Sequence, residues 1–334
     1  MVSEIVVITG ASAGVGRATA HAFARRGAQI ALIARGVDRL RAAAAEVERL
    51  GGVPLILPVD VADADAVEGA AAAVERHFGA IDIWINCAMA TIFAPFAAVT
   101  AEEYRRATEV TYLGYVYGTM AALKGMRRRD RGTIVQVGSA LAYRSIPLQS
   151  PYCGAKHAIR GFTDSLRSEL IHERSRVHVT MVQMPALNTP QFDWARNKMK
   201  RRPQPVPPIF EPEIAADAII HAAHVRRREI WVGASTVGAI IANRLVPRLL
   251  DRYLGKAGYE GQLTAKPARA DAPDNLFAPL PGDHGTRGRF SRRARERCPE
   301  LWASRHRGSL LAGGCGLAGL VAGLWLRRAT ISAR

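Results

Sequence analysis

The first two thirds of the chain alternate between two hydrophobic periods. Short apolar runs rich in β-branched residues predict strands at 5–8, 29–34, 53–59, 81–85, 132–137 and 176–182. Between them, stretches rich in Ala, Arg and Glu repeat apolar positions at helical spacing, which predicts helices over 36–50, 63–78 and 101–129. Continuous apolar strands separated by helices are typical of a parallel sheet covered on both faces. The pattern therefore predicts a doubly wound α/β fold.

This pattern continues to about residue 254 and then changes. A helix is predicted over 211–227, a strand over 229–232 and an amphipathic helical stretch over 234–254. We therefore predict one catalytic domain over residues 1–254. Residues 255–307 are rich in Pro, Gly, Ala and Arg and show little periodicity, so we expect a largely disordered linker.

An apolar stretch without charges covers 308–326 and is followed by a short tail, 327–334. Its 19 residues are close to the minimum for a helix that crosses a bilayer. Gly319 and Gly323 form a small-xxx-small face, and Trp325 lies where an interfacial anchor is expected. We predict a transmembrane or membrane-associated helix. A helix-pairing segment and a disordered tail remain the alternatives.

The charge of the chain is strongly basic, and close to half of the excess of +17 follows residue 255. Arginines are denser before the apolar stretch than after it, which predicts a cytoplasmic catalytic domain and favours contact with anionic lipid. Nucleic acid is not expected as a partner, because aromatic residues do not interleave with these arginines.

The N-terminus lacks the features of a secretory signal. The four cysteines show no metal-binding spacing, so we expect no metal and reduced, buried thiols.

A glycine-rich turn follows the first predicted strand and opens a helix. In the segment Val7–Gly16, Gly10 permits a tight turn, Gly14 allows a pyrophosphate to come close to the backbone, and Gly16 allows the helix to pack on the sheet. Free N–H groups at the start of that helix would face the phosphates. The strand–turn–helix context favours a dinucleotide site over a ligand-free turn.

The end of the second predicted strand bears on the choice of dinucleotide. An NAD site usually has a carboxylate there for the ribose 2′-hydroxyl, but this strand ends in Ala34-Arg35. Arg35 can pair with a 2′-phosphate, and Arg17 and Arg39 add positive charge, so NADP(H) is favoured over NAD(H). The alternative for Arg35 is a solvated loop charge. Asp60 follows the third strand and either accepts a hydrogen bond from the adenine or caps the next helix.

Three residues suggest proton transfer. Tyr152 and Lys156 are spaced four apart and so share one face of a helix. A cation one turn away can lower the pKa of a phenol, which carbonyl/alcohol redox chemistry requires of its acid/base. Ser139 follows a strand at the edge of the sheet where such folds bind ligands, so its hydroxyl can hydrogen-bond the reacting oxygen.

With these pieces in place, the chain resembles the short-chain dehydrogenase/reductase family over about residues 2–254. The resemblance implies a Rossmann fold and an NAD(P)-dependent oxidoreductase acting on CH–OH groups. It makes Tyr152 the general acid/base, Lys156 the group that lowers its pKa and holds the nicotinamide ribose, and Ser139 the group that orients the substrate. The cofactor-binding residues it implies are Thr9, Gly10, Ser12, Gly14, Val15, Gly16, Arg35, Asp60, Val61, Asn86, Ala88, Tyr152, Lys156, Pro185 and Thr189.

The chain departs from the family pattern at two positions near this site. Met89 stands where the family has a glycine after Ala88. Thr111 stands where many members have a helix asparagine that completes a proton relay to the lysine, and we assign it to the catalytic set in that place. These departures are the support for an alternative hypothesis, a catalytically impaired dinucleotide-binding scaffold or redox sensor at a membrane.

The remaining expectations concern partners. Apolar residues after Pro185, with Met89, Leu141 and Ile146 opposite, predict a pocket for a lipophilic carbonyl or alcohol, although they also suit simple packing of a lid. Family members often pair through the helices that match 101–129 and 152–173, so a homodimer or homotetramer is expected by analogy.

Overall fold

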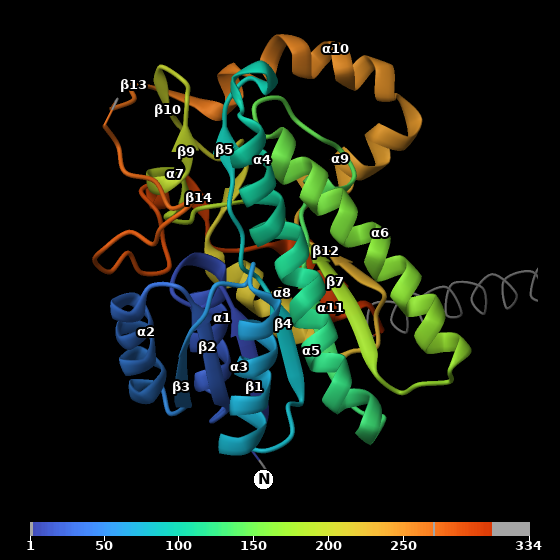
Figure 1. The fold of residues 1–334 in the computed structure, drawn as a ribbon. Coiled ribbons are helices and arrows are strands. Elements are labelled where there is room, and N and C mark those ends of the chain that lie inside the picture. The colour runs from blue at the N-terminus through green and yellow to red at the C-terminus, as the bar shows by residue number, and fades with distance from the viewer. Residues whose placement is uncertain (1–2, 270, 309–334) are drawn as a thin grey trace, which may run out of the picture.

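The computed structural model describes residues 3–269 and 271–308 and centres on one parallel sheet (Figure 1). Its seven strands lie in the order β12-β7-β6-β4-β1-β2-β3, and every neighbouring pair is parallel. The strands are β1 (Ile5–Thr9), β2 (Gln29–Ala34), β3 (Val53–Pro58), β4 (Ile83–Asn86), β6 (Thr133–Val137), β7 (His178–Gln183) and β12 (Glu229–Trp231). This arrangement confirms the predicted doubly wound, Rossmann-type fold.

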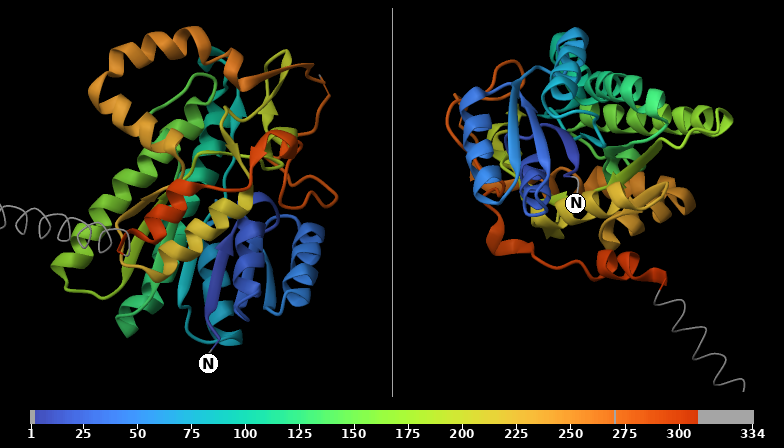
Figure 2. Two further views of the ribbon diagram at one scale, coloured as in Figure 1. Left: turned by 180° about the vertical axis from the view of Figure 1, so that it is seen from behind. Right: turned by 90° about the horizontal axis from the view of Figure 1, so that it is seen from below.

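Two helical layers cover the sheet, as the view from below shows (Figure 2). One face packs against α1 (Gly14–Ala24), α2 (Val37–Arg49) and α8 (Pro212–His224). The other face packs against α3 (Ala64–His77), α4 (Ala101–Thr108), α5 (Gly114–Arg129) and α6 (Ser150–His172). The central strands are buried on both faces, which is why their sequences are continuously apolar rather than alternating.

The order of the strands places the ligand-binding edge. The chain reverses direction across the sheet between β1 and β4, which are hydrogen-bonded neighbours. In such sheets the carboxyl ends of the strands open into a crevice at this switch point. The loops after β1, β4 and β6 all begin there.

Shorter elements assemble above this edge. Three small sheets pair β5 (Ile92–Phe93) with β9 (Arg196–Asn197), β10 (Arg201–Pro203) with β13 (Leu263–Pro267), and β11 (Ile209–Phe210) with both β8 (Ala186–Leu187) and β14 (Ala294–Arg295). The remaining helices are α7 (Gln191–Trp194), α9 (Ala234–Leu245), α10 (Pro247–Ala257), α11 (Pro299–Arg305) and the short helical turns η1 (Phe96–Ala98), η3 (Ala140–Ala142), η4 (Glu260–Gln262) and η5 (Ser291–Arg293).

Two helices that the periodicity predicts as continuous are interrupted. The predicted helix 101–129 contains a π-helical turn, η2 (Glu109–Leu113), between α4 and α5. The stretch 234–254 divides into α9 and α10 at Pro247, because proline has no N–H and its ring excludes the carbonyl of the preceding turn. Apolar periodicity continues through both breaks, so it does not reveal them.

The segment after residue 254 differs from the expected linker. From 255 to 308, apart from residue 270, it folds back over the catalytic core and carries η4, β13, η5, β14 and α11. Four apolar side chains of this segment are buried at separate places along it, those of Leu263, Leu276, Phe290 and Leu301. An extended segment that buries isolated side chains does not need apolar residues at helical or strand spacing. The hydrophobic pattern of the sequence therefore predicts less ordered structure in this segment than the structure shows.

The predicted membrane helix lies outside the residues that the structure describes. Of the stretch 308–326 only Gly308 belongs to the described residues, and the tail 327–334 lies outside them as well. Within residues 3–269 and 271–308, no helix has both the length and the apolar character needed to span a bilayer.

Candidate active site

The turn after β1 has a shape that only glycine allows. Gly10 and Gly14 have φ values of 70° and 55°, in the left-handed region. A Cβ on Gly10 would lie 2.8 Å from the Cα of Ala88, and one on Gly16 would lie 2.3 Å from the carbonyl oxygen of Gly10. The helix α1 then begins without a side-chain cap. The turn therefore lets a phosphate-bearing ligand approach the backbone at the start of α1, where the N–H of Gly14 now donates to the carbonyl of Gly285 (3.1 Å).

Two of the predicted cofactor residues lie behind this turn rather than in the cavity wall. The Thr9 hydroxyl accepts hydrogen bonds from the backbone N–H groups of Cys87 (2.9 Å) and Ala88 (3.2 Å). Asn86 is fully buried, and its amide donates to Thr119 (3.1 Å) and Gln136 (3.0 Å). Both side chains tie the ends of neighbouring strands together, so they support the site from outside the cavity.

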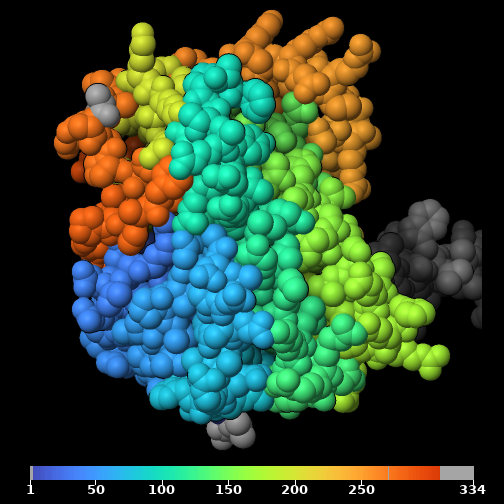
Figure 3. Space-filling model, viewed as in Figure 1, coloured from blue at the N-terminus to red at the C-terminus, as the bar shows by residue number. Residues whose placement is uncertain are grey.

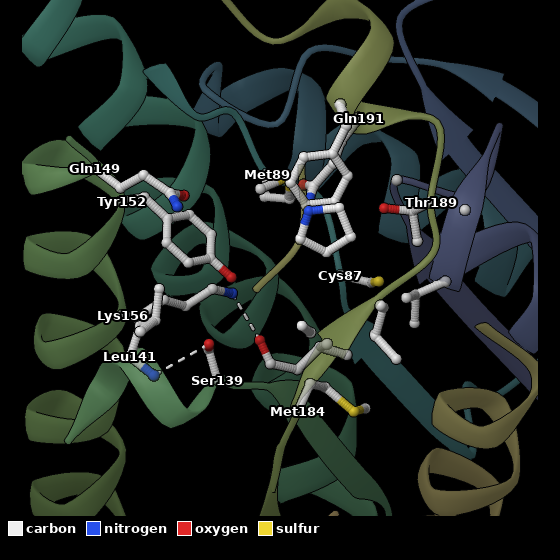
Figure 4. Close-up of a pocket in the computed structure, with 18 of the residues that line it drawn as sticks. Cys87, Met89, Ser139, Leu141, Gln149, Tyr152, Lys156, Met184, Thr189 and Gln191 are labelled. Atoms are coloured by element: carbon white, nitrogen blue, oxygen red, sulfur yellow. Dashed lines mark hydrogen bonds between the residues drawn. The ribbon is translucent and has the colours of Figure 1, made fainter. Parts of the chain in front are cut away.

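The three predicted catalytic side chains face one cavity (Figure 4). Tyr152 and Lys156 project from successive turns of α6, and Ser139 approaches from the loop after β6. The Ser139 hydroxyl accepts the backbone N–H of Leu141 (3.1 Å), so its own hydrogen remains available for another acceptor. The Lys156 Nζ lies 5.4 Å from the centre of the Tyr152 ring. The structure thus brings together the phenol, ammonium and hydroxyl that the sequence selects.

Lys156 is buried and held by a partner that the sequence reading missed. Its Nζ donates to the carbonyl oxygen of Val137 (2.7 Å) and to the hydroxyl of Tyr115 (3.1 Å). Tyr115 in turn donates to the same carbonyl (3.0 Å). Burial lowers the pKa of Lys156 to about 8. Tyr115 follows Thr111 by one helical turn. This spacing is the one feature of the sequence that indicates a second polar residue near the lysine.

Tyr152 responds to its surroundings in the direction opposite to the expected one. Burial in the cavity wall raises its pKa well above the ordinary value of a phenol, and a hydrogen bond with Ser139 offsets part of that rise. In this structure the phenol is therefore held in its protonated form, as a proton donor requires.

Thr111 makes no direct hydrogen bond with the lysine. Its hydroxyl donates to the carbonyl oxygen of Ala90 (2.9 Å) and accepts the N–H of the same residue (2.9 Å). Both hydrogen-bonding functions that matter for a relay are thereby committed to the loop after β4. The structure assigns Thr111 a structural contact and separates it from the group formed by Tyr152, Lys156 and Ser139.

The residues at the adenosine end differ from expectation in their partners. Arg35 donates to the backbone carbonyls of residues 275–277. Asp60 caps the loop that follows it by accepting the N–H of Ala62 (3.1 Å), and it also pairs with Arg106. Arg35 and Asp60 both line the cavity, but a segment from the C-terminal part of the chain uses much of the bonding capacity of Arg35.

Arg39 is the basic residue here with spare capacity. It is 5% exposed, its Nε donates to the carbonyl of Gly282 (3.0 Å), and its guanidinium lies over the Trp194 ring at 4.8 Å. Its Nη2 is buried without a hydrogen-bond partner among the described residues, beside the uncapped N-terminus of α2. An unpaired buried N–H next to free backbone donors suits an anionic group. Together with the glycine cradle, it shows that the residues present fit a phosphorylated dinucleotide.

A single cavity of about 810 Å³ joins these parts. Besides the residues above, its wall contains Ser12, Val15, Val61, Ala88, Pro185 and Thr189 from the predicted cofactor set. Its lining also contains the apolar residues that the sequence offers to a substrate, Met89, Leu141, Ile146, Phe192 and Trp194, although Trp194 lies against Arg39.

The sequence reading missed the polar residues of this cavity that come from outside the motifs. Gln149 lies one turn before Tyr152, and its amide donates to the side chain of Gln262 (2.7 Å). Gln262 belongs to the segment expected to be disordered. Among the described residues, no cluster of His, Cys, Asp or Glu is arranged to hold a metal ion.

Comparison with known proteins agrees with this geometry. The profile of the family described as short chain dehydrogenase matches residues 4–200. An uncharacterised oxidoreductase of Bacillus subtilis, YxnA, is 32% identical over 276 residues, which cover 82% of this chain and 78% of that protein. The human dehydrogenase/reductase SDR family member 7 is 36% identical over half of each chain, and 3-dehydrosphinganine reductase of Danio rerio is 33% identical over 56% of this chain and 57% of its own.

A solved structure has the same arrangement. It is an alcohol dehydrogenase from the archaeon Thermococcus sibiricus in complex with 5-hydroxy-NADP, and it matches with a TM-score of 0.57 at 28% identity. The match covers 69% of this chain and 96% of the archaeal one. From the family profile, the relatives and the shared fold, we conclude that the chain belongs to the short-chain dehydrogenase/reductase family, NAD(P)-dependent oxidoreductases that act on alcohol and carbonyl groups.

Proposed function

We propose that this enzyme uses NADP(H) to interconvert a hydroxyl and a carbonyl group on a lipophilic small molecule, with Tyr152 as general acid/base. The observation that carries the proposal is the meeting of Tyr152, Lys156 and Ser139 in the same cavity as the glycine turn. These groups occupy the switch point of the sheet, where a dinucleotide and its substrate can meet.

The proposed chemistry assigns one task to each side chain. A bound nicotinamide supplies or accepts the hydride at the substrate carbon. In the reductive direction Tyr152 gives its phenolic proton to the substrate oxygen, and the raised pKa keeps that proton in place until it is needed. The ammonium of Lys156 stabilises the phenolate that remains, and Ser139 donates a hydrogen bond to the substrate oxygen. In the oxidative direction the same groups act in reverse.

The preference for NADP(H) is supported by charge at the adenosine end. The second strand ends in Ala34-Arg35, without a carboxylate that would repel a 2′-phosphate. The unpaired Nη2 of Arg39 lies beside this position. The archaeal alcohol dehydrogenase whose fold matches binds an NADP derivative.

A lipophilic substrate is supported by the apolar part of the cavity lining. Met89, Leu141, Ile146 and Phe192 line the cavity, and they come from four separate loops or helices. Such a wall favours an apolar molecule around a single polar reaction centre.

Membrane association is supported by the surface of α9 and α10 as well as by the apolar stretch 308–326. Ile241, Leu245, Leu249 and Tyr253 are exposed on these helices, and basic residues run beside them at 244, 248, 252 and 256. Exposed apolar side chains flanked by cations are typical of a helix at an anionic lipid surface. We expect the full chain to float with anionic vesicles, and a truncation before Gly308 to float less. Unchanged flotation of the truncated chain would remove the terminal helix from the proposal.

Self-association remains an expectation from the family. On α5 and α6, Met120 and Ile171 are exposed apolar side chains that pairing would cover. A mass measured by light scattering distinguishes a monomer from a dimer or tetramer.

The experiment that tests the proposed function is a screen of carbonyl compounds with both reduced cofactors on the full chain. Oxidation of NADPH by apolar ketones or aldehydes, with a lower KM for NADPH than for NADH, is the expected result. Tight NADPH binding without turnover on any carbonyl would instead favour the non-catalytic scaffold or sensor.

A further inference from the structure

A segment that the family profile does not cover lies across the cofactor groove. Residues 275–288, here called the strap, run over the ends of β1 and β2, and the orange chain at this place lies directly against the blue N-terminal region (Figure 3). The family match ends at residue 200, so the strap lies outside the matched residues. Two strap residues, Asn275 and Pro279, belong to the wall of the 810 Å³ cavity.

The strap is fixed at both ends by buried contacts. At its start, Leu276 is fully buried in the core between the sheet and the layer of α3 to α6. At its end, the N–H of Gly288 donates to the carbonyl of Asn188 (3.1 Å), and the next buried side chain is Phe290. The part between these anchors has glycines with positive φ at 282 and 285 and crosses the groove without a hydrophobic anchor of its own.

Along its length, from the anchored start onward, the strap occupies groups that a dinucleotide would use. Arg35 donates to three of its backbone carbonyls, among them that of Phe277 (2.9 Å). Arg39 donates to the carbonyl of Gly282 (3.0 Å), and Arg17 pairs with Asp283. These are the three arginines that the sequence offers to a 2′-phosphate.

The strap also reaches the glycine turn itself. The backbone N–H of Gly14, at the start of α1, donates to the carbonyl of Gly285 (3.1 Å). This N–H is one of the helix-terminal donors that suit a pyrophosphate. The strap therefore presents acceptor oxygens to both parts of the adenosine end, as an anionic ligand would.

The cavity beneath the strap nevertheless remains large. The strap forms an outer wall, and the Arg39 Nη2 under it still lacks a partner. A ligand that uses the Gly14 N–H and these arginines would therefore have to take the place that the strap carbonyls now hold. A molecule with several phosphate charges can reach that position only if the strap moves away from the turn.

We propose that residues 275–288 form a gate over the adenosine end of the cofactor groove. Its part between the anchors must lift from Arg39, Arg17 and the N–H of Gly14 before the dinucleotide can enter or leave. The gate rests on the proposed use of NADP(H). Its consequence is that cofactor exchange, and not only affinity, depends on a segment outside the residues that the family profile matches. Opening breaks hydrogen bonds between the strap and the arginines, and the ligand's phosphates replace the acceptors that are lost.

A reversible cross-link tests the gate directly. An ideal Cβ on Gly36 would lie 3.5 Å from the Cβ of Pro279, within the range of a disulfide, and the φ of −84° at Gly36 accepts any residue. The double variant Gly36→Cys/Pro279→Cys can therefore lock the strap in full-length protein. The described native cysteines, Cys87, Cys153 and Cys298, are buried. Each single cysteine variant, treated with the same oxidant, is the matched control.

NADPH fluorescence in a stopped-flow instrument reads out the result without any turnover. After oxidation we expect NADPH association to slow by at least about tenfold, and release from protein loaded before oxidation to slow similarly. Dithiothreitol should restore both rates. Exchange at the unlocked rate in the oxidised variant would overturn the gate, and so would failure of the two thiols to pair, because the strap would then not rest at Gly36.

The two proposals fail in different ways in this experiment. If the reduced variant and the unmodified chain do not bind NADPH at all, the proposed cofactor is wrong and the gate falls with it. If both bind normally and the lock changes nothing, only the gate is wrong.

A second variant loosens the strap instead of locking it. Asp283→Asn removes the charge that pairs with the buried Arg17, whose other carboxylate partner is Glu46. We expect NADPH release to accelerate about two- to fivefold, the range that corresponds to one partly exposed ion pair. Asp271→Asn is the control, because Asp271 pairs with Arg269 outside the strap. Equal release rates in the two variants would contradict a gate held by Asp283.

Discussion

Tyr115→Phe probes the residue that holds the buried lysine. The change removes one hydroxyl, which accepts a hydrogen bond from the Lys156 Nζ (3.1 Å) and donates one to the carbonyl of Val137 (3.0 Å). The ring remains, and with it the contact between the ammonium and the aromatic face at 4.7 Å. Because Tyr115 touches Lys156 rather than the reacting atoms, we regard it as a positioning residue.

The size of the effect follows from the loss of one acceptor for a buried cation. A hydrogen bond to a charged group contributes about 1.5–3 kcal/mol, and one pKa unit corresponds to about 1.36 kcal/mol. The carbonyl of Val137 remains as an acceptor at 2.7 Å, so we take the lower end of this range. The pKa of Lys156, which burial already lowers to about 8, should then fall by about one further unit.

The sign of the pH dependence is set by the form that acts. The ammonium stabilises the phenolate of Tyr152, so activity requires protonated Lys156 and is lost as the pH rises through its pKa. In the unmodified enzyme kcat/KM for reduction should decline above about pH 8. In Tyr115→Phe the decline should begin about one pH unit lower, with little change at acidic pH.

The assay is the pH profile of kcat/KM for NADPH-dependent reduction of one carbonyl substrate. Tyr112→Phe is the matched control, because Tyr112 lies three residues away and packs against Phe162 instead of the lysine. A merely structural loss would reduce activity equally at every pH. A Tyr115→Phe profile that is scaled down but not shifted would therefore refute the assigned role.

Three further changes test other parts of the site. Gly16→Ala places a Cβ 2.3 Å from a backbone oxygen of the turn, so NADPH affinity by fluorescence titration should fall at least about tenfold, whereas Gly69→Ala, with open space around it, should leave affinity unchanged. Arg39→Gln should raise the Kd for NADPH about tenfold or more and leave the Kd for NADH nearly constant. An equal rise in both dissociation constants would exclude a role of Arg39 toward the 2′-phosphate. Thr111→Val leaves the buried backbone N–H and carbonyl of Ala90 without their partner, so the free energy of unfolding should fall by about 2–4 kcal/mol. The pH profile of activity should not shift. A shifted profile would instead support a role of Thr111 in a proton relay.

The catalytic core was predictable because its signals are local. Buried parallel strands need continuous apolar runs, and the turn after β1 needs glycine where φ is positive or where a Cβ would collide. Tyr152 and Lys156 are one helical turn apart, so the sequence also gives their relative position. The placement of Ser139 follows from the end of β6, which the strand pattern marks.

The rest depends on contacts between residues far apart in the chain. Lys156 meets Tyr115 across 41 positions, and Arg35 meets the strap across about 240. Neither separation leaves a periodic trace, so the sequence pattern predicts a linker over residues 255–307, where the strap lies. The sequence predicts that Arg35 faces a ligand, but its partners in the structure are main-chain carbonyls. Because every residue has such a carbonyl, the sequence does not indicate which ones Arg35 will bind. Thr111 was assigned by its place in the family pattern, although its hydroxyl is committed to the neighbouring loop.

The measurement that tests the central claim most directly is the rate of carbonyl reduction by Tyr152→Phe with saturating NADPH, compared with Tyr104→Phe. Tyr104 lies on α4, and its hydroxyl donates to the carbonyl of Ser150 outside the cavity. Loss of the proton donor should reduce kcat by about 10²–10⁴-fold in Tyr152→Phe while NADPH still binds, and Tyr104→Phe should retain the original rate. Equal rates in the two variants, with normal cofactor binding, would contradict proton transfer by Tyr152.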